Sequence, residues 1–271
     1  MIRFYLSGNP AHDRVIEAFY AGCPEDKILV EDWHYEPSDL AVIFGIGKKK
    51  VPVSWPRGKV FSQQRDNNLD VVVLETGYIN RGDGENHHYA AGINGLNGRA
   101  YFNNSKCPPD RFMKLGVEIK PYQRGNHIVL CGQVPWDASV DHVDFLSWLG
   151  WSSQVLSSLT ARKIIFRPHP MAGLPPIDGC EYSLRPLSQD LKDAWALVAF
   201  NSNSTVEALL EGVPVFVSDE GAMTYHVGNK VLSRIESPQY FDREQWAYDL
   251  AYCQWTPQEM REGLAWKHLF P

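Results

Sequence analysis

Short apolar runs alternate along the chain with longer segments in which apolar residues recur at helical spacing. The clearest runs are 71–74, 127–131 and 196–200, and each ends at a cluster of glycine or polar residues. An apolar run without alternating polar positions is typical of a strand that is covered on both faces. Residues 11–21 and 242–253 instead carry the period of an amphipathic helix.

This alternation predicts an α/β fold in which parallel strands are connected by helices. The length of 271 residues accommodates two Rossmann-like domains, which we expect to face each other across a central cleft. We place the boundary near Arg124, which gives an N-terminal domain of residues 1–125 and a C-terminal domain of residues 126–271. The Gly- and Asn-rich stretch 79–105 is predicted to be a long irregular segment.

The stretch from 162 to 214 carries the strongest pattern. One strand runs into the Arg-Pro-His-Pro loop 167–170, and a second strand runs into an Asn-Ser-Asn-Ser-Thr loop, 201–205, at the start of a helix. In open α/β sheets, ligands bind beyond the carboxyl ends of the strands. We therefore expect the two loops to lie at one edge of a sheet and to hold the phosphate of a nucleotide.

His169 and the hydroxyl-rich loop are the candidate ligands of this phosphate. The prolines on either side of His169 restrict the backbone and present the imidazole in one direction, and Arg167 adds a positive charge. Free N–H groups at a helix start favour an anion. Further donors come from the side chains of Ser202, Asn203, Ser204 and Thr205. The alternatives are a structural histidine that closes a strand and plain helix capping, which explains one of the hydroxyls.

Two carboxylates also follow strand ends. Asp137 lies beyond the strand that ends at Cys131, and Glu75 ends the clearest strand of the first half. Glycosyl chemistry needs one carboxylate at the anomeric centre and another that manages the acceptor proton, here one from each domain. Alternatively, Asp137 caps a helix over 138–149 and Glu75 forms a salt bridge with Arg81, and the spacing leaves these alternatives open.

Composition and charge narrow the choice of function. The net charge of −6 argues against a broadly basic nucleic-acid-binding protein. The lysines at 48–50, with Arg57, Lys59 and Arg65, form either a local basic patch or a solvated loop. Five cysteines without a C-x-x-C pair argue against a disulfide framework or zinc site and favour a cytoplasmic location. We predict no bound metal, and no apolar run approaches the ~20 residues that a transmembrane segment needs.

Taken together, these motifs resemble a known family. The segment IVLCGQVPWDASV, 128–140, resembles the Gly-Gln-Val-x-x-Asp-Ala-Ser segment of bacterial capsule-polysaccharide biosynthesis proteins, the β-Kdo transferase group. The Arg-Pro-His-Pro loop and the segment 203–215 are similar to that family's histidine and serine motifs, and ETGYINR, 75–81, is similar to its Glu-Asp-Gly-Phe-x-Arg segment. The tail CQWTPQEMREGLAWKHL, 253–269, looks like its closing helix. This chain departs from the pattern at Pro135-Trp136, where the family has acidic residues.

The resemblance implies a GT-B glycosyltransferase whose C-terminal helices pack back against the domains. Such an enzyme would act on a nucleotide-sugar donor, CMP-Kdo by analogy, and on a glycan acceptor. By the same resemblance, His169 and the 202–205 loop would hold the CMP phosphate. Asp137 would be the nucleophile or anomeric-centre carboxylate of a retaining reaction, and Glu75 the acceptor-side acid/base. The substrate-orienting residues would be Arg81, Gln133 and Glu207. Neither a metal nor a cofactor is implied, because histidine and helix-end donors stabilise the leaving phosphate.

Two further functions fit the same residues. A DNA-modifying glycosyltransferase of the phage type would act on a hydroxylated base, and the basic run at 48–50 would then meet the phosphate backbone. A non-catalytic module that binds a nucleotide or a glycan would keep the fold without the chemistry. Acceptor binding to DNA would weaken steeply with salt, whereas binding to a neutral glycan would not.

Overall fold

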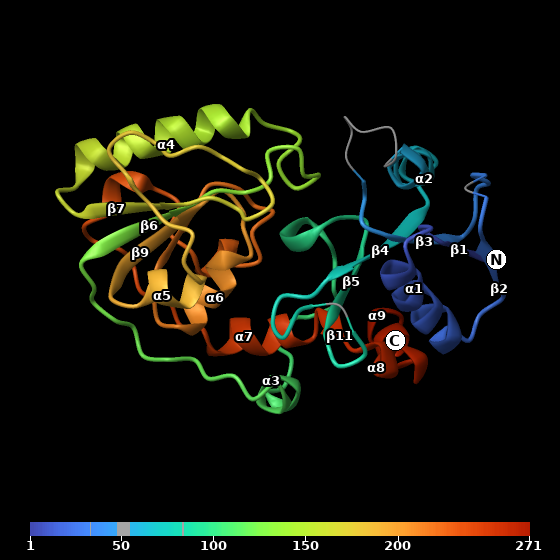
Figure 1. Ribbon diagram of the computed structural model, residues 1–271. Helices are drawn as coiled ribbons and strands as arrows, with labels where there is room; N and C mark the ends of the chain where they lie inside the picture. The colour runs from blue at the N-terminus through green and yellow to red at the C-terminus, as the bar shows by residue number, and fades with distance from the viewer. Residues whose placement is uncertain (33, 48–54, 83) are drawn as a thin grey trace. The chain divides into compact units, whose positions relative to one another are not determined.

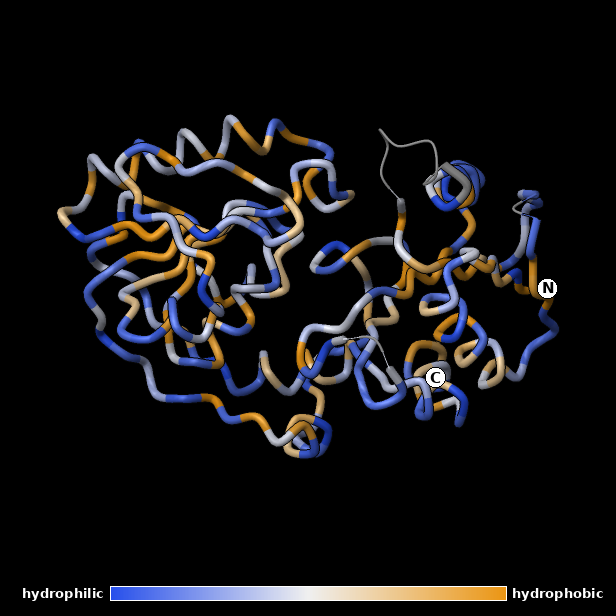
Figure 2. The backbone as a smooth tube through the Cα atoms, viewed as in Figure 1, coloured by the Kyte–Doolittle hydropathy of each residue, from blue (hydrophilic) through white to orange (hydrophobic). Residues whose placement is uncertain are grey.

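The computed structural model describes residues 1–32, 34–47, 55–82 and 84–271, which form two compact units (Figure 1). Unit 1 comprises Met1–Leu115 and Ala247–Pro271, and unit 2 comprises Gly116–Trp246. Each unit has its own sheet and its own apolar core. Figure 2 shows apolar residues along the central strands of each unit and polar residues in the loops around them.

The sheet of unit 1 has a parallel part and an antiparallel edge. Its order is β11-β5-β4-β3-β1-β2, in which β1 to β4 are parallel and β5 and β11 are antiparallel to their neighbours. The strands are β1 (Ile2–Tyr5), β2 (Lys27–Val30), β3 (Leu40–Phe44), β4 (Asp70–Thr76), β5 (Tyr89–Ile93) and β11 (Gln254–Trp255). The carboxyl ends of the parallel strands therefore lie at one edge.

Helices complete unit 1. The first of them, α1 (Pro10–Gly22), starts at Asn9, whose side chain accepts a hydrogen bond from the Ala11 N–H, and buries Val15 and Phe19 against the sheet. The others are α2 (Trp55–Asp66), η2 (Asn97–Arg99), α3 (Asp110–Lys114), α8 (Pro257–Arg261) and α9 (Leu264–Leu269). Helix α7 (Glu244–Ala251) carries the chain from unit 2 back into unit 1.

The buried amide of Gln254 fixes the returning C-terminal segment in unit 1. Its Oε1 accepts from the N–H groups of Tyr78 and Ile79, at 2.7 and 2.9 Å, and its Nε2 donates to the Ile79 carbonyl at 3.0 Å. These backbone groups are buried and need partners, and the side-chain amide supplies the hydrogen bonds that a neighbouring strand would otherwise make. Strand β11 then pairs with β5 through Gln254↔Ala90.

Arg111 forms a second attachment of the C-terminal segment. Its guanidinium donates to both carboxylate oxygens of Glu259, at 2.7 and 3.0 Å, and stacks on the Trp255 ring at 3.8 Å. Burial raises the pKa of the Glu259 carboxyl, but hydrogen bonds from Arg111 and from the Thr256 backbone outweigh that effect and hold it below its usual range. The ion pair thus keeps Glu259 ionised at neutral pH.

These contacts change the predicted domain boundaries of 1–125 and 126–271. Residues 247–271 belong to unit 1 instead of the C-terminal domain, and residues 116–125 belong to unit 2. The physical reason is the bonding of Gln254 and Arg111 just described, together with the packing of Trp255, Met260 and Trp266 in the core of unit 1.

The sheet of unit 2 is entirely parallel among the described strands, in the order β10-β9-β6-β7-β8. The strands are β6 (His127–Cys131), β7 (Lys163–Arg167), β8 (Glu181–Tyr182), β9 (Ala194–Ala199) and β10 (Val215–Val217). The helices are α4 (Phe145–Leu159), α5 (Leu187–Leu191), α6 (Ser204–Leu210), η3 (Tyr225–Val227) and η4 (Leu232–Arg234).

Apolar clusters cover both faces of this sheet. On one face Leu156 of α4 belongs to a cluster with Ile128, and on the other face Leu209 of α6 belongs to a cluster with Val129 and Val215. Both faces are buried, which explains why the strands read as unbroken apolar runs.

The predicted α/β class is confirmed, and so are the strands expected at 71–74, 127–131 and 196–200, within one or two residues. Two expectations were wrong. The irregular stretch 79–105 contains strand β5, and the closing helix is split at Gly263, whose φ is 75°. In the described part of the chain, no helix combines the length and apolarity that a membrane crossing requires.

Replacing Arg111 by alanine should lower the free energy of unfolding by about 2–3 kcal/mol, because Glu259 and Trp255 both lose their partner. Urea denaturation of the full chain measures this loss. The matched control is Arg65→Ala in the same unit, whose pair with Asp70 has side chains 37% and 56% exposed. That change should cost less than about 1 kcal/mol, and equal losses in the two variants would contradict the role given to Arg111.

Candidate functional site

The candidate site lies at the carboxyl edge of the sheet of unit 2. Strands β6, β7, β9 and β10 all run in one direction, so the loops that follow them emerge at the same edge. The predicted nucleotide ligands and Asp137 belong to these loops. The hydrogen bonds below show which of the loops meet.

Gln133 and Asn201 join the loops after β6 and β9. Gln133 Nε2 donates to Asn201 Oδ1 at 2.7 Å, and the Asn201 backbone N–H donates to Gln133 Oε1 at 3.0 Å. Both side chains are buried. Gln133, predicted to orient substrate, therefore has a firm structural partner, and its contact with a substrate stays a prediction.

Asp219 extends this network to the loop after β10. The carboxylate is 8% exposed and accepts from Asn201 Nδ2 and from the Gly221 N–H, at 2.8 and 2.9 Å. Its other oxygen lies 3.0 Å from Nε2 of His142, whose side chain is 38% exposed. The network thus reaches from the buried strand ends to a partly exposed imidazole.

Asp137 organises a turn in the loop after β6. Its Oδ1 accepts from the N–H and from the hydroxyl of Ser139, at 2.9 and 2.8 Å. Helix α4 starts eight residues later, at Phe145, and is capped by Asp144, which accepts from the Ser147 N–H at 3.1 Å. Asp137 is therefore not the cap of a helix over 138–149, and that alternative is wrong.

The loop before α6 is held together by its own hydroxyl groups. Ser202 Oγ accepts from the backbone N–H and the hydroxyl of Ser204, at 3.3 and 3.0 Å. Thr205 is fully buried, and its hydroxyl donates to the Ser202 carbonyl and accepts from Thr224, at 2.7 and 2.9 Å. Asn203 and Ser204 are half-buried, so the loop has an accessible side and a buried support.

Ser204 also touches the end of strand β6. Burial raises the pKa of the Cys131 thiol to about 11, and a hydrogen bond with Ser204 opposes the rise only in part. The thiol is therefore protonated and unreactive at neutral pH, although it lies beneath the loop. This contact places the loop of residues 202–205, called the serine loop from here on, over β6 as well as β9.

His169 follows β7 in a loop that its own side chain stabilises. Its Nδ1 accepts from the Met171 N–H at 3.2 Å, and its carbonyl accepts from the Ala172 N–H at 2.9 Å. A neutral imidazole in this geometry carries its proton on Nε2, which makes that nitrogen a donor. The ring is half-buried.

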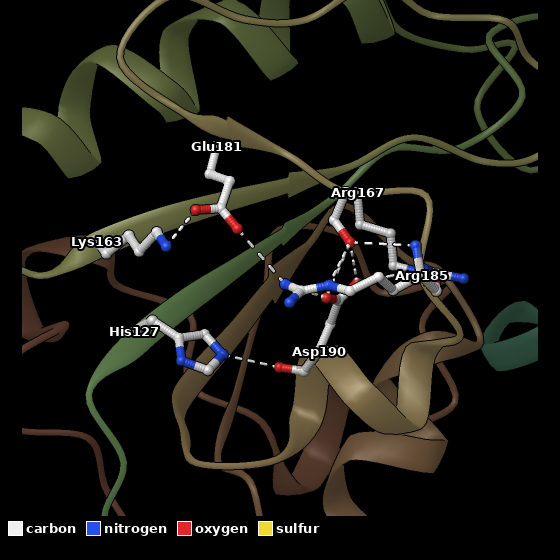
Figure 3. Close-up of polar contacts among 7 residues, drawn as sticks. His127, Lys163, Arg167, Glu181, Arg185 and Asp190 are labelled. Carbon is white, nitrogen blue, oxygen red and sulfur yellow. Dashed lines mark hydrogen bonds and ion pairs between the residues drawn. The ribbon is translucent and has the colours of Figure 1, made fainter.

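Arg167 points toward a buried carboxylate (Figure 3). Its guanidinium lies 3.2 Å from Oδ2 of Asp190, which is fully buried, and Arg185 lies 2.8 Å from the other oxygen. The Ser183 hydroxyl donates to the same carboxylate at 2.9 and 2.8 Å. Arg167 therefore anchors the end of β7, and its predicted contact with a phosphate stays a prediction.

In unit 1, Glu75 lies at the carboxyl end of β4 beside Arg57. Its Oε1 accepts from the Thr76 N–H at 2.8 Å, and a side chain at Gly45 would come within 3.3 Å of both Glu75 and Arg57. Burial lowers the pKa of Arg57, and the negative charges of Glu75 and Asp13 oppose this. Arg57 is thus a cation close enough for its charge to act on Glu75. Arg81 is exposed, and its predicted role stays a prediction.

Several predicted site residues are described by the structure without a test of their roles. Glu207 is half-buried in the first turn of α6, and its predicted contact with a substrate stays a prediction. Asp137 and Glu75 lie in different units, so their joint action also stays a prediction. The lysines at 48–50 lie outside the described residues. Among the described residues, no group of three His, Cys, Asp or Glu side chains is arranged to hold a metal ion.

Comparison with known proteins identifies the fold. No protein-family model matches the chain, and no curated protein matches it. The solved structure of a β-Kdo 2,7 transferase, KpsC of Thermosulfurimonas dismutans, is similar with a TM-score of 0.57 and 15% identity, over 97% of this chain and 98% of that chain. The β-Kdo 2,4 transferase of the same organism's KpsC is similar with a TM-score of 0.57 and 13% identity, over 92% and 89%. This similarity shows a shared GT-B-like α/β fold.

Sequence reasoning included Asn201 in the 201–205 loop without giving it a role, and it missed Asp219 and His142 as parts of the site. Asn201 and Asp219 each follow a parallel strand within two residues, which is the same signal that singled out His169. His142 carries no such signal, because its place depends on the turn that Asp137 forms.

Replacing Asp190 by alanine should lower the free energy of unfolding by about 3–5 kcal/mol, because Arg167 would keep a largely buried charge without its carboxylate. Thermal and urea unfolding measure the effect. Glu236→Ala is the control, since its pair with Arg162 has side chains 46% and 26% exposed. It should change stability by about 1 kcal/mol or less. A small loss for Asp190→Ala would refute the anchoring role of Arg167.

Proposed function

We propose that the chain is a glycosyltransferase that transfers a sugar from a nucleotide donor to a glycan. One observation carries the proposal. The chain shares its fold, over nearly its whole length, with two solved structures named as β-Kdo transferases. Those names favour CMP-Kdo, or a related CMP-sugar, as the donor. The strand-end loops of unit 2 supply groups of the right chemistry for its phosphate.

In this proposal the phosphate binds at the accessible side of the serine loop. Donors come from Ser202, Asn203 and Ser204 and from Nε2–H of His169, while Thr205 supports the loop from beneath. The Nδ1 bond from Met171 favours this donor tautomer of His169. Such fixed donors stabilise negative charge as it develops on the leaving phosphate.

The transfer itself would use two carboxylates. The bond between the anomeric carbon and the phosphate oxygen breaks, and the oxygen keeps the electron pair. Asp137 bonds to or stabilises the anomeric carbon. An acceptor hydroxyl then attacks that carbon and gives its proton to Glu75, and the Asp137 carboxylate leaves with the electron pair of any bond that it had formed. Arg57 lies beside Glu75 and places a positive charge near the carboxylate that accepts this proton.

A thermal-shift screen with CMP, UDP, GDP and ADP tests the nucleotide site. CMP should raise the melting temperature, because a ligand at 100 times its Kd adds about 2.7 kcal/mol to stability. His169→Ala should weaken CMP binding about tenfold through the loss of one charge-assisted or neutral donor. A response to UDP alone would contradict the CMP-sugar donor, and no response to any nucleotide would contradict the nucleotide site.

Asp137→Asn should lower turnover of CMP-Kdo by about a thousandfold or more, because an amide cannot stabilise the anomeric centre as a carboxylate does. The amide oxygen still accepts from Ser139, so the turn should remain. Glu75→Gln should abolish transfer to an acceptor but keep release of CMP to water. Asp178→Asn, at an exposed position, is the control. Turnover equal to that of this control in both variants would show that the carboxylates are misassigned.

A further inference from the structure

The side chain of Asn201 is the centre of a saturated buried network. The residue is 5% exposed. Its Oδ1 accepts from Gln133 at 2.7 Å, and its Nδ2 donates to the Ser139 carbonyl and to Asp219 Oδ1, both at 2.8 Å. Every bond lies within ordinary hydrogen-bond distance, so the position and orientation of this amide are determined from three sides.

This network connects loops that follow three different strands. Gln133 and Ser139 lie after β6, Asn201 lies after β9, and Asp219 lies after β10. The loops are otherwise far apart in sequence, by 62 residues between Ser139 and Asn201 and by 18 between Asn201 and Asp219. The Asn201 amide therefore bonds residues of all three loops at one sheet edge.

Two of these loops carry the residues proposed to act on the donor. Ser139 is held from both sides, because Asp137 Oδ1 accepts from its N–H and hydroxyl while Asn201 donates to its carbonyl. On the other side, Asn201 directly precedes Ser202. The hydroxyl oxygen of Ser202 accepts from the Ser204 hydroxyl, and its carbonyl accepts from the Thr205 hydroxyl. Asn201 is thus one hydrogen bond from Ser139 in the Asp137 turn and one peptide bond from Ser202 in the serine loop.

We propose that Asn201 is a positioning residue that couples the serine loop to the Asp137 turn. This inference rests on the proposed function, which gives the serine loop and Asp137 their roles toward the donor. A nucleotide phosphate that orders the serine loop also orders the Asp137 turn through the Asn201 amide. The carboxylate is then fixed relative to the leaving phosphate when a donor is bound, and it is less strictly fixed before.

The substitution that tests this role is Asn201→Asp. It keeps the size of the side chain but replaces the Nδ2 donor by an oxygen, which cannot bond the Ser139 carbonyl. A carboxylate would also face Asp219 at the position of that donor, so the side-chain bond to Asp219 is lost as well. The backbone bonds from Ser218 and Asp219 to the Phe200 carbonyl remain. Asn201→Ala is a second variant that removes the amide without adding charge.

Asn229 offers a matched control in the same unit. It is also a buried asparagine, 7% exposed, with three side-chain bonds. Its Nδ2 donates to the carbonyls of Val215 and Gln239, at 3.3 and 3.1 Å, and its Oδ1 accepts from the Gln239 N–H at 2.8 Å. None of these partners belongs to the Asp137 turn or the serine loop. Asn229→Asp therefore reports the effect of losing a buried amide elsewhere.

Amide hydrogen exchange of the full chain, followed on peptides covering 133–144 and 200–206, measures the coupling. Without ligand, Asn201→Asp and Asn201→Ala should both speed exchange in the two peptides about tenfold relative to Asn229→Asp, as loss of a buried hydrogen bond predicts. Faster exchange in 200–206 alone, or the same pattern in Asn229→Asp, would overturn the proposal. This arm needs no nucleotide, so it decides the coupling even if the proposed function fails.

CMP provides the second arm. In the unsubstituted chain and in Asn229→Asp, saturating CMP should slow exchange in both peptides. In the Asn201 variants it should slow exchange in 200–206 but leave 133–144 unchanged, a difference that a purely structural role would not produce. Protection of 133–144 by CMP in the Asn201 variants would overturn the coupling. The absence of any CMP protection in the unsubstituted chain would count against the CMP-binding site and not against the bonds of Asn201.

Discussion

The parallel direction of β6, β7, β9 and β10 is the constraint on which the candidate site depends. Both faces of these strands are covered by apolar side chains, so polar groups can gather only where the strands end. There the loops must also satisfy the buried backbone groups that the strands leave behind. The amides of Gln133 and Asn201 and the carboxylate of Asp219 meet this requirement, and in doing so they bring separate loops into one site.

The same rule explains the division of the chain into units. The N–H groups of Tyr78 and Ile79 are buried, and Gln254, more than 170 residues away in sequence, supplies their acceptor. Arg111 adds an ion pair and a stacked ring to that attachment. The C-terminal segment therefore completes the first sheet, and the domain that begins the chain also ends it. Unit 1 consequently depends on residues that a division of the sequence at one point would separate.

Local signals allowed much of the fold to be predicted from the sequence. The apolar runs of β6 and β9 depend on neighbouring residues, and the structure has these strands where they were expected. Strand β5 was missed because Ala90, Ala91 and Gly92 carry little apolar signal, although pairing with β4 makes them a strand. The pairing of Arg167 with Asp190 and the bonds of Asn201 join distant segments, so no local pattern could predict them.

The central claim is that the carboxyl edge of the sheet of unit 2 holds the phosphate of a nucleotide. A crystal structure of the full chain soaked with CMP tests it most directly. We expect the phosphate to lie against Ser202 and Ser204 with a hydrogen bond from Nε2 of His169, and the Asp137 turn to lie beside it. CMP bound at another surface, with the serine loop and His169 unoccupied, would contradict a nucleotide site at this edge.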